Sequence, residues 1–254
     1  MNSRWKMETG RLTVFIPLVG LLILMMSLNG TRTAGMQNNF PLLTLAGDAV
    51  LLEDRLRLTT DQDNQTGAAW LTNPPSVDQG FVTTFDWQIL RSDPAVGADG
   101  FAFVIQNDSS SALGSGGSGI GYQGIANSLA VEFDTSQNPP EEFGSGAGDP
   151  NGNHLSVQTR GTQPNSADPT YSRGFTTDIP VLSDGNVHTS KIFYAPGTLL
   201  IFLDDLANPV LTVPVDLETT LNLDPDQTWV GFTAATGGRS QAHDILSFTH
   251  AETE

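Results

Sequence analysis

The sequence contains no cysteine and few basic residues. Without cysteine in its 254 residues, the chain has no disulfide framework, no thiol nucleophile and no cysteine-ligated zinc site, so oxygen and imidazole ligands must hold any metal. Eleven Lys and Arg residues stand against 28 Asp and Glu residues, which gives a net charge of −17. Because so acidic a chain repels phosphate backbones, we expect no nucleic-acid partner.

The sequence also lacks amphipathic runs of helical period. Its 26 Gly and 15 Pro, together with a charged fraction of only 15%, disfavour a helical bundle, and a hydrophobic fraction of 38% is too high for disorder. The length suits one large all-β domain that buries its own core.

Residues 1–35 have the features of a targeting segment. Arg4, Lys6 and Arg11 precede an uncharged run of 17 residues, Leu12–Leu28. This pattern predicts a signal peptide, with an uncleaved N-terminal membrane anchor as the alternative, and either one predicts a secreted or cell-surface protein. We expect membrane contact only through such an anchor. The remainder, with 7 basic and 27 acidic residues, would carry a net charge of −20.

Residues 36–254 contain no composition break or internal repeat, and we expect a single domain. Short runs of apolar and β-branched residues alternate with clusters of Gly, Pro, Asn and Asp, which is typical of strands and turns. Many strands without intervening helices predict an antiparallel β-sandwich or jelly roll. The expected strands are Phe81–Leu90, Phe101–Ile105, Ser128–Phe133, His154–Gln158, Lys191–Tyr194, Leu199–Leu203, Trp229–Thr233 and Ile245–Phe248.

An acidic motif in the middle of the chain predicts a metal site. Glu132 and Asp134 lie two residues apart, so both side chains point to the same face of a strand, where they repel each other unless a cation neutralises them. Asn138, Asp149 and His154 follow within the same short stretch. The oxygens suit Ca²⁺ and the imidazole suits a transition ion, which favours two adjacent cations. The alternative is a solvated acidic face followed by an ordinary strand histidine.

These residues resemble the metal loop of the L-type (legume) lectins, particularly the bacterial members of that family. Three other segments match family blocks in the same order: Gly97–Phe103, Gly119–Tyr122 and Val230–Gly238. The resemblance extends over most of the chain after residue 38. It implies a concanavalin-like jelly roll that binds carbohydrate and performs no catalysis.

The resemblance also implies roles for individual residues. A transition ion, Mn²⁺ in this family, would be held by Glu132, Asp134, Asp149 and His154. The Ca²⁺ ligands would be Asp134, the Ser136 carbonyl, Asn138 and Asp149. Sugar would be bound by Asp99, Gly117, Gly119, Asn138, Gly238 and Arg239, and the Ala98–Asp99 peptide would be cis.

One position departs from the family pattern. Ser136 stands where the family usually places an aromatic ring that stacks on the sugar, and its absence removes ~1 kcal/mol or more of stacking energy. This departure supports a second hypothesis, in which the protein is a structural or adhesion module that keeps the metals for stability alone.

A third hypothesis is a glycoside hydrolase on the same type of sandwich. Retaining enzymes of this kind use two carboxylates roughly 5 Å apart, and Glu132 and Asp134 could form such a pair. A metal-bound carboxylate is a poor general acid, however, because the cation stabilises the ionised form. We therefore favour an exported, non-catalytic lectin. The sequence specifies neither the sugar nor the oligomeric state.

Overall fold

The computed structural model describes residues 40–72, 77, 79–91, 97–144, 148–224 and 228–253. The predicted targeting segment, residues 1–35, lies outside the described residues. In the described ranges, no helix combines the length and hydrophobicity that crossing a bilayer requires.

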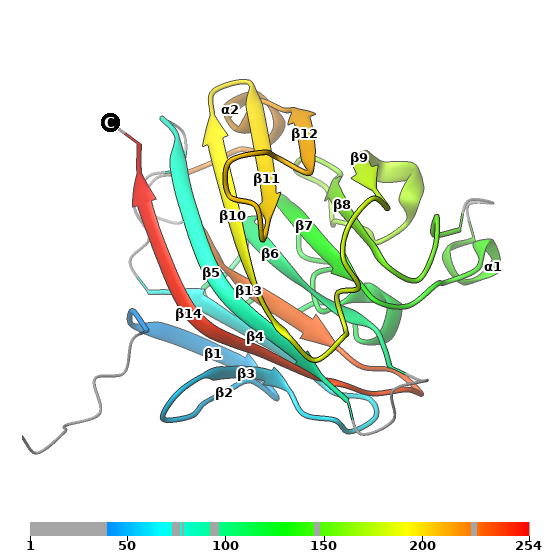
Figure 1. Cartoon of the computed structure of the whole chain (residues 1–254). Coiled ribbons are helices and arrows are strands. Elements are labelled where there is room, and N and C mark those ends of the chain that lie inside the picture. The colour runs from blue at the N-terminus through cyan, green and yellow to red at the C-terminus, as the bar shows by residue number, and fades with distance from the viewer. Residues whose placement is uncertain are drawn as a thin grey trace, which may run out of the picture. The chain divides into compact units, whose positions relative to one another are not determined.

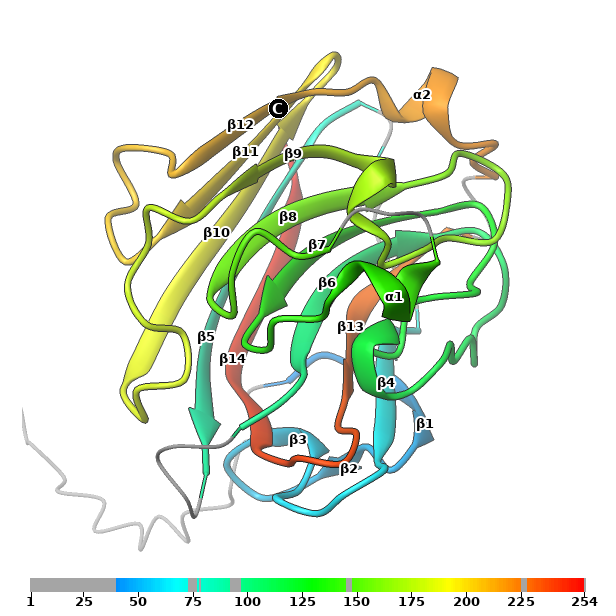
Figure 2. The ribbon, with the colours of Figure 1, turned by 90° about the vertical axis from the view of Figure 1, so that its right-hand side faces the viewer.

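The described residues form two antiparallel sheets of seven strands each (Figures 1 and 2). The front sheet has the strand order β1 (Leu43–Gly47), β4 (Thr66–Leu71), β13 (Trp229–Ala235), β6 (Gly100–Gln106), β7 (Ser128–Asp134), β8 (His154–Thr159), β9 (Ser172–Thr176). The back sheet has the order β12 (Leu211–Pro214), β11 (Thr198–Leu203), β10 (Val187–Ala195), β5 (Phe81–Leu90), β14 (Ala242–Glu252), β3 (Leu56–Thr59), β2 (Val50–Leu51). This architecture is the predicted all-β sandwich.

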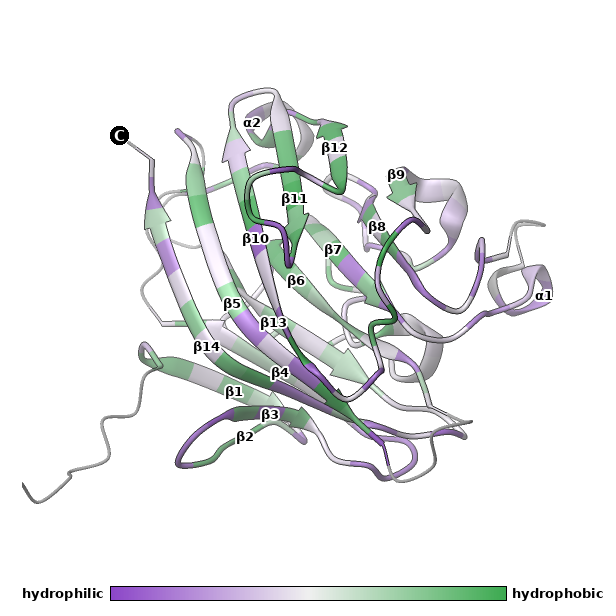
Figure 3. Ribbon diagram, in the orientation of Figure 1, coloured by the Kyte–Doolittle hydropathy of each residue, from purple (hydrophilic) through white to green (hydrophobic). Residues whose placement is uncertain are grey.

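The core lies between the two sheets. Strand β5 alternates buried and half-buried residues along its whole length, so that Phe85 and Trp87 point inward. Phe85 packs edge-on against Phe232 of β13, with ring centroids 4.9 Å apart, and Phe101 stacks on Phe133 at 4.5 Å. Hydrophobic residues along the strands colour the ribbon green in Figure 3. The contact between Phe85 and Phe232 joins the two sheets, whereas the stack of Phe101 on Phe133 joins neighbouring strands of the front sheet.

The outer face of the front sheet is also covered. A second apolar cluster forms there, in which Ile120 and Tyr122 of the loop between β6 and β7 pack with Ala102 and Ala130. Every residue of β6 and β7 is therefore buried, which explains the continuous apolar run in β6. The same cover buries the polar side chains that β7 directs outward.

The structure contains all eight predicted strands, and it adds shorter ones. Edge strands β1, β2, β9 and β12 are at most five residues long, too short to give a clear pattern, and β4 carries Gly and Ala at its centre. The described helices are single turns: α1 (Pro140–Phe143), α2 (Leu217–Thr220), η1 (Gly117–Gly119) and η2 (Pro169–Tyr171).

Candidate functional site

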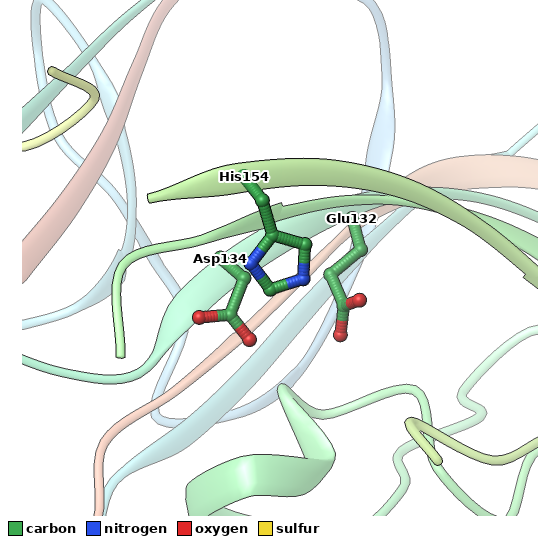
Figure 4. A group of neighbouring side chains, drawn as sticks. All are labelled: Glu132, Asp134 and His154. Atoms are coloured by element: carbon green, nitrogen blue, oxygen red, sulfur yellow. The ribbon is translucent and has the colours of Figure 1, made fainter. Parts of the chain in front are cut away.

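Two neighbouring strands bring together three of the predicted metal ligands. Asp134 of β7 pairs with His154 of β8, and Glu132 lies two residues before Asp134 on the same face. Each of the three side chains offers a ligand atom within 4.8 Å of the others (Figure 4). All three are buried, with at most 3% of their surface exposed.

The protein alone leaves the negative charge of this cluster uncompensated. Burial raises the pKa of Glu132 to about 7, and burial together with Glu132 raises the pKa of Asp134 well above its ordinary value. Burial lowers the pKa of His154 to about 4, so the imidazole is neutral at pH 7. Buried carboxylates beside a neutral imidazole form a donor set suited to a divalent cation.

Hydrogen bonds orient the side chains of this cluster. Tyr122 Oη donates to Glu132 Oε1 over 3.0 Å, and Ser156 Oγ donates to Glu132 Oε2 over 2.6 Å. His154 Nδ1 lies 3.1 Å from the Asn151 carbonyl, which can only accept, so Nδ1 carries the proton and Nε2 keeps its lone pair for a metal. Tyr122 and Ser156 were not predicted, because neither neighbours Glu132 in sequence.

The loop after β7 carries the other predicted metal ligands. Ser136 N–H donates to Asp134 Oδ1 over 2.7 Å, and Asn138 N–H donates to Asp149 Oδ2 over 2.8 Å. Asp149 lies outside the 4.8 Å triad, and burial raises its pKa to about 6. The buried Asn138 Oδ1 accepts no hydrogen bond from the described residues. This amide oxygen and the Asp149 carboxyl are thus further oxygen donors next to the triad.

A pocket of about 340 Å³ lies beside this loop. Asp99, Gly117, Asn138, Gly238 and Arg239, five of the six residues predicted to bind sugar, line it together with Ser136. The sixth, Gly119, does not: its N–H donates to the Gly116 carbonyl within η1. Ser118, Gln137 and Gly237 line the pocket without having been predicted.

Asp99 presents an unsatisfied carboxylate oxygen in this pocket. The Ala98–Asp99 peptide is cis, as the resemblance implied. The backbone of Asp99 is fixed on both sides, because its N–H donates to the Ala235 carbonyl and its carbonyl accepts from Thr135 N and Oγ1. The buried Oδ2 has no hydrogen-bond partner among the described residues. Burial, reinforced by the charge of Glu142, raises the pKa of Asp99 to about 7, against the opposing effect of Arg239.

A buried chain of hydrogen bonds braces this loop from the back sheet. Gln241 Nε2 lies in hydrogen-bond contact with Thr135 Oγ1 and 3.0 Å from His243 Nε2. His243 Nδ1 is 2.6 Å from Thr59 Oγ1, which also donates to the Gln241 carbonyl. Burial lowers the pKa of His243 to about 3, so the neutral ring accepts at Nε2 and donates at Nδ1. The loop that holds Asp99 is therefore anchored to β14.

Comparison with known proteins places this geometry in a family. The family model described as the legume lectin beta-barrel domain matches residues 35–248. The chain belongs to the legume, or L-type, lectin family. A lectin of Pisum sativum is 26% identical over 265 residues, which cover 94% of this chain and 90% of that lectin. The L-type lectin-domain containing receptor kinase VIII.1 of Arabidopsis thaliana is 29% identical over 224 residues, and the matched region is 29% of the kinase's length.

Solved structures share the fold. Basic winged bean lectin, crystallised with Tn-antigen, superposes with a TM-score of 0.64 at 27% identity and covers 85% of this chain and 97% of its own. The exoplasmic/lumenal domain of VIP36, in its Ca²⁺/Man3GlcNAc-bound form, gives 0.64 at 19% identity and covers 84% and 87% of the two chains. This chain therefore has the carbohydrate-binding fold of the L-type lectin family.

Proposed function

We propose that the protein is an exported lectin whose sugar site is organised by Ca²⁺ and a transition ion, Mn²⁺ in the family pattern, and which performs no catalysis. The observation that carries the proposal is that two residues lining one pocket each have a buried oxygen without a hydrogen-bond partner among the described residues. These oxygens are Asp99 Oδ2 and Asn138 Oδ1. An ionised Asp accepts hydrogen bonds from two sugar hydroxyls, and such charge-assisted bonds are stronger than neutral ones. Export rests on the apolar segment near the N-terminus and on the lumenal setting of VIP36.

The side chains of the cluster fit the proposed ions. Glu132, Asp134, Asp149 and His154 would hold the transition ion, which takes the imidazole, and Asp134, Ser136, Asn138 and Asp149 would hold Ca²⁺ through oxygen. A bound ion supplies positive charge that keeps these buried carboxylates ionised. Asn138 would take part in both calcium binding and sugar binding. Its oxygen would face calcium, while its Nδ2, 3.0 Å from Glu142 Oε2, lies beside the pocket.

Two observations bear on the alternative functions. Glu132 and Asp134 are close enough to resemble a hydrolase pair, but both oxygens of Glu132 accept hydrogen bonds from Tyr122 and Ser156 under a covered face. A general acid needs an oxygen that reaches the substrate, so this arrangement disfavours the hydrolase.

The structural-module alternative is favoured by Ser136, because none of the described side chains that line the pocket is aromatic.

A glycan-array screen of the protein in calcium plus manganese, repeated after chelation, tests the proposal. We expect a signal on a defined set of sugars that chelation removes. Silence under both conditions, with calcium still raising the melting temperature, would establish the structural module instead. Sugar release from bound glycans would establish the hydrolase.

A further inference from the structure

The outer face of β8 and β9 carries a second hollow, separate from the Asp99 pocket. It consists of two adjoining pockets, of about 470 Å³ and about 220 Å³, which share Ser172 and which we call the β8–β9 groove. Thr159, the last residue of β8, lines the larger pocket. His154, a proposed metal ligand, is the first residue of the same strand. These strand ends are about 17 Å apart at the usual rise per residue. The larger pocket is therefore remote from the proposed metal ligands, whereas the smaller pocket adjoins them, because His154 lines it.

The larger pocket is basic in a molecule that is otherwise strongly acidic. Arg160 and Arg173 line it, and they are two of only seven basic residues after residue 35. Among the described residues, neither arginine forms an ion pair, whereas Arg55 and Arg57 are both paired with Asp244. Two guanidinium groups without a carboxylate partner form a site for an anion.

Arg160 is held in a fixed orientation. Its guanidinium lies 4.5 Å from the centroid of the Tyr171 ring, and its Nη1 donates to the Pro164 carbonyl over 3.2 Å. The remaining N–H groups of Arg160 donate to no group of the described residues and can bind a ligand. A guanidinium that is already oriented loses less conformational entropy when it binds than a freely rotating one.

The smaller pocket offers an aromatic surface and a buried acceptor. Phe175 lines it and is 57% exposed. Arg173, which lies two residues earlier in β9, lines the larger pocket. Gln158 also lines this pocket, and its buried Oε1 has no hydrogen-bond partner among the described residues. An exposed ring beside an unsatisfied acceptor suits a ligand with an apolar face and hydroxyl groups.

We propose that the β8–β9 groove is a second binding site for an acidic saccharide. Arg160 and Arg173 hold its carboxylate or sulfate group, Phe175 packs against the apolar face of a neighbouring sugar ring, and Gln158 accepts a hydroxyl. The saccharide class rests on the proposed lectin function, while the requirement for an anion rests on the arginines alone.

Isothermal titration with four probes tests the proposal: tetragalacturonate, a chondroitin sulfate tetrasaccharide, neutral maltotetraose and inorganic sulfate, all at one ionic strength. We expect at least one acidic tetrasaccharide to bind, and the comparison of the two shows whether uronate or sulfate ester is preferred. Maltotetraose binding as tightly as both acidic probes would overturn the proposal. Inorganic sulfate binding as tightly as both would show a free-anion site and overturn the saccharide assignment, as would no binding by any probe.

Matched variants locate the binding. Arg160→Gln and Arg173→Gln should each weaken acidic-tetrasaccharide binding about tenfold or more, and Phe175→Ala about threefold to tenfold. Lys191→Gln, which removes a cation on the back sheet, should have no effect. Asp99→Ala should leave this binding intact, so failure of the proposed lectin site and failure of the groove are distinguishable. Wild-type affinity in both arginine variants, or loss of binding in Asp99→Ala, would overturn the assignment to the groove.

Discussion

In the proposed function, Asp99 is the residue on which sugar binding depends most directly. Its Oδ2 has no hydrogen-bond partner among the described residues, so truncation removes the proposed acceptor for sugar while leaving the hydrogen bonds of its backbone in place. We expect Asp99→Ala to abolish binding to the glycans that wild type selects, and to leave calcium affinity unchanged within a few-fold. Glycan-array signal and calcium titration measure the two effects separately. Equal glycan signal from the variant and wild type would contradict the assignment of Asp99.

Gly237 provides a milder test of the same pocket. A methyl group at this position would lie 3.2 Å from Asp99 Oδ2, where it would exclude a hydroxyl without removing any charge. Gly237→Ala should therefore weaken sugar binding and leave the calcium-dependent rise in melting temperature unchanged. Lys191→Gln, on the back sheet away from the pocket, is the control and should bind sugar as wild type does. Sugar titrations that show the same affinity for Gly237→Ala and wild type would contradict this account.

Asp134 should have opposite effects on stability with and without metal. In the metal-free protein its buried carboxyl is crowded by Glu132, so Asp134→Asn should raise the melting temperature in a chelator at pH 8. In calcium, wild type gains about 2.7 kcal/mol when the ion is at 100 times its Kd, which corresponds to a rise of about 5–10 °C. The variant should lose this rise. Calorimetry under the two conditions checks the crossover, and equal calcium-dependent melting in both proteins would refute the shared-ligand role of Asp134.

At the scale of elements, one buried carboxylate joins β3 to β14. The Asp244 side chain is fully buried and accepts two hydrogen bonds from Arg57, at 2.7 and 2.8 Å, and one from Arg55 at 3.1 Å. Arg57→Met should lower the free energy of unfolding by about 3 kcal/mol, because it strips Asp244 of its two-point partner. Arg55→Met should cost about 1 kcal/mol or less, since Arg57 remains. Urea unfolding measures the free energy of unfolding of both variants. Equal losses would show that the two hydrogen bonds from Arg57 stabilise the fold no more than the single one from Arg55.

The strands and their contacts differ in how well the sequence predicts them. The central strands β6 and β7 are buried on both faces, so their apolar runs are unambiguous, and the spacing of Glu132 and Asp134 within β7 places both carboxylates on one face. Pairing across strands has no such local signal. The contacts of Tyr122 and Ser156 with Glu132, and of Gln241 with Thr135, join residues 10, 24 and 106 positions apart and emerge only from the fold. Gly119 does not line the pocket, and its N–H donates to the Gly116 carbonyl in the turn at η1, a local contact that the sequence pattern does not reveal.

For the molecule as a whole, metal and pH should act together on stability. The raised pKa values of Glu132 and Asp149, about 7 and about 6, mean that the metal-free fold takes up protons, so these groups lose their stabilising contribution as pH rises from about 4 to about 7. His154 and His243 have lowered pKa values of about 4 and about 3, so their contribution is lost as pH falls below about 6.5. The two trends oppose each other in a chelator.

Bound cations should remove only the first of these trends, because they hold the carboxylates ionised. The melting temperature should therefore rise with pH between about 4.5 and 7 in calcium plus manganese, and vary much less in a chelator. Differential scanning calorimetry at several pH values in each buffer checks the slopes. Parallel curves in the two buffers would show that these carboxylates do not hold the metal.

The hydrogen-bond chain from Thr59 through His243 and Gln241 to Thr135 has a further consequence, for the thermodynamics of recognition. It clamps the Asp99 loop to a long strand of the back sheet, so the loop has little freedom left to lose when a ligand arrives. Binding should then carry a small conformational entropy cost, and cutting the clamp should raise that cost while every group that touches the sugar stays in place. In Gln241→Ala, calorimetric titration would record the weaker affinity as a more unfavourable entropy of binding. The precision of the proposed sugar site is in this sense a property of the opposite sheet.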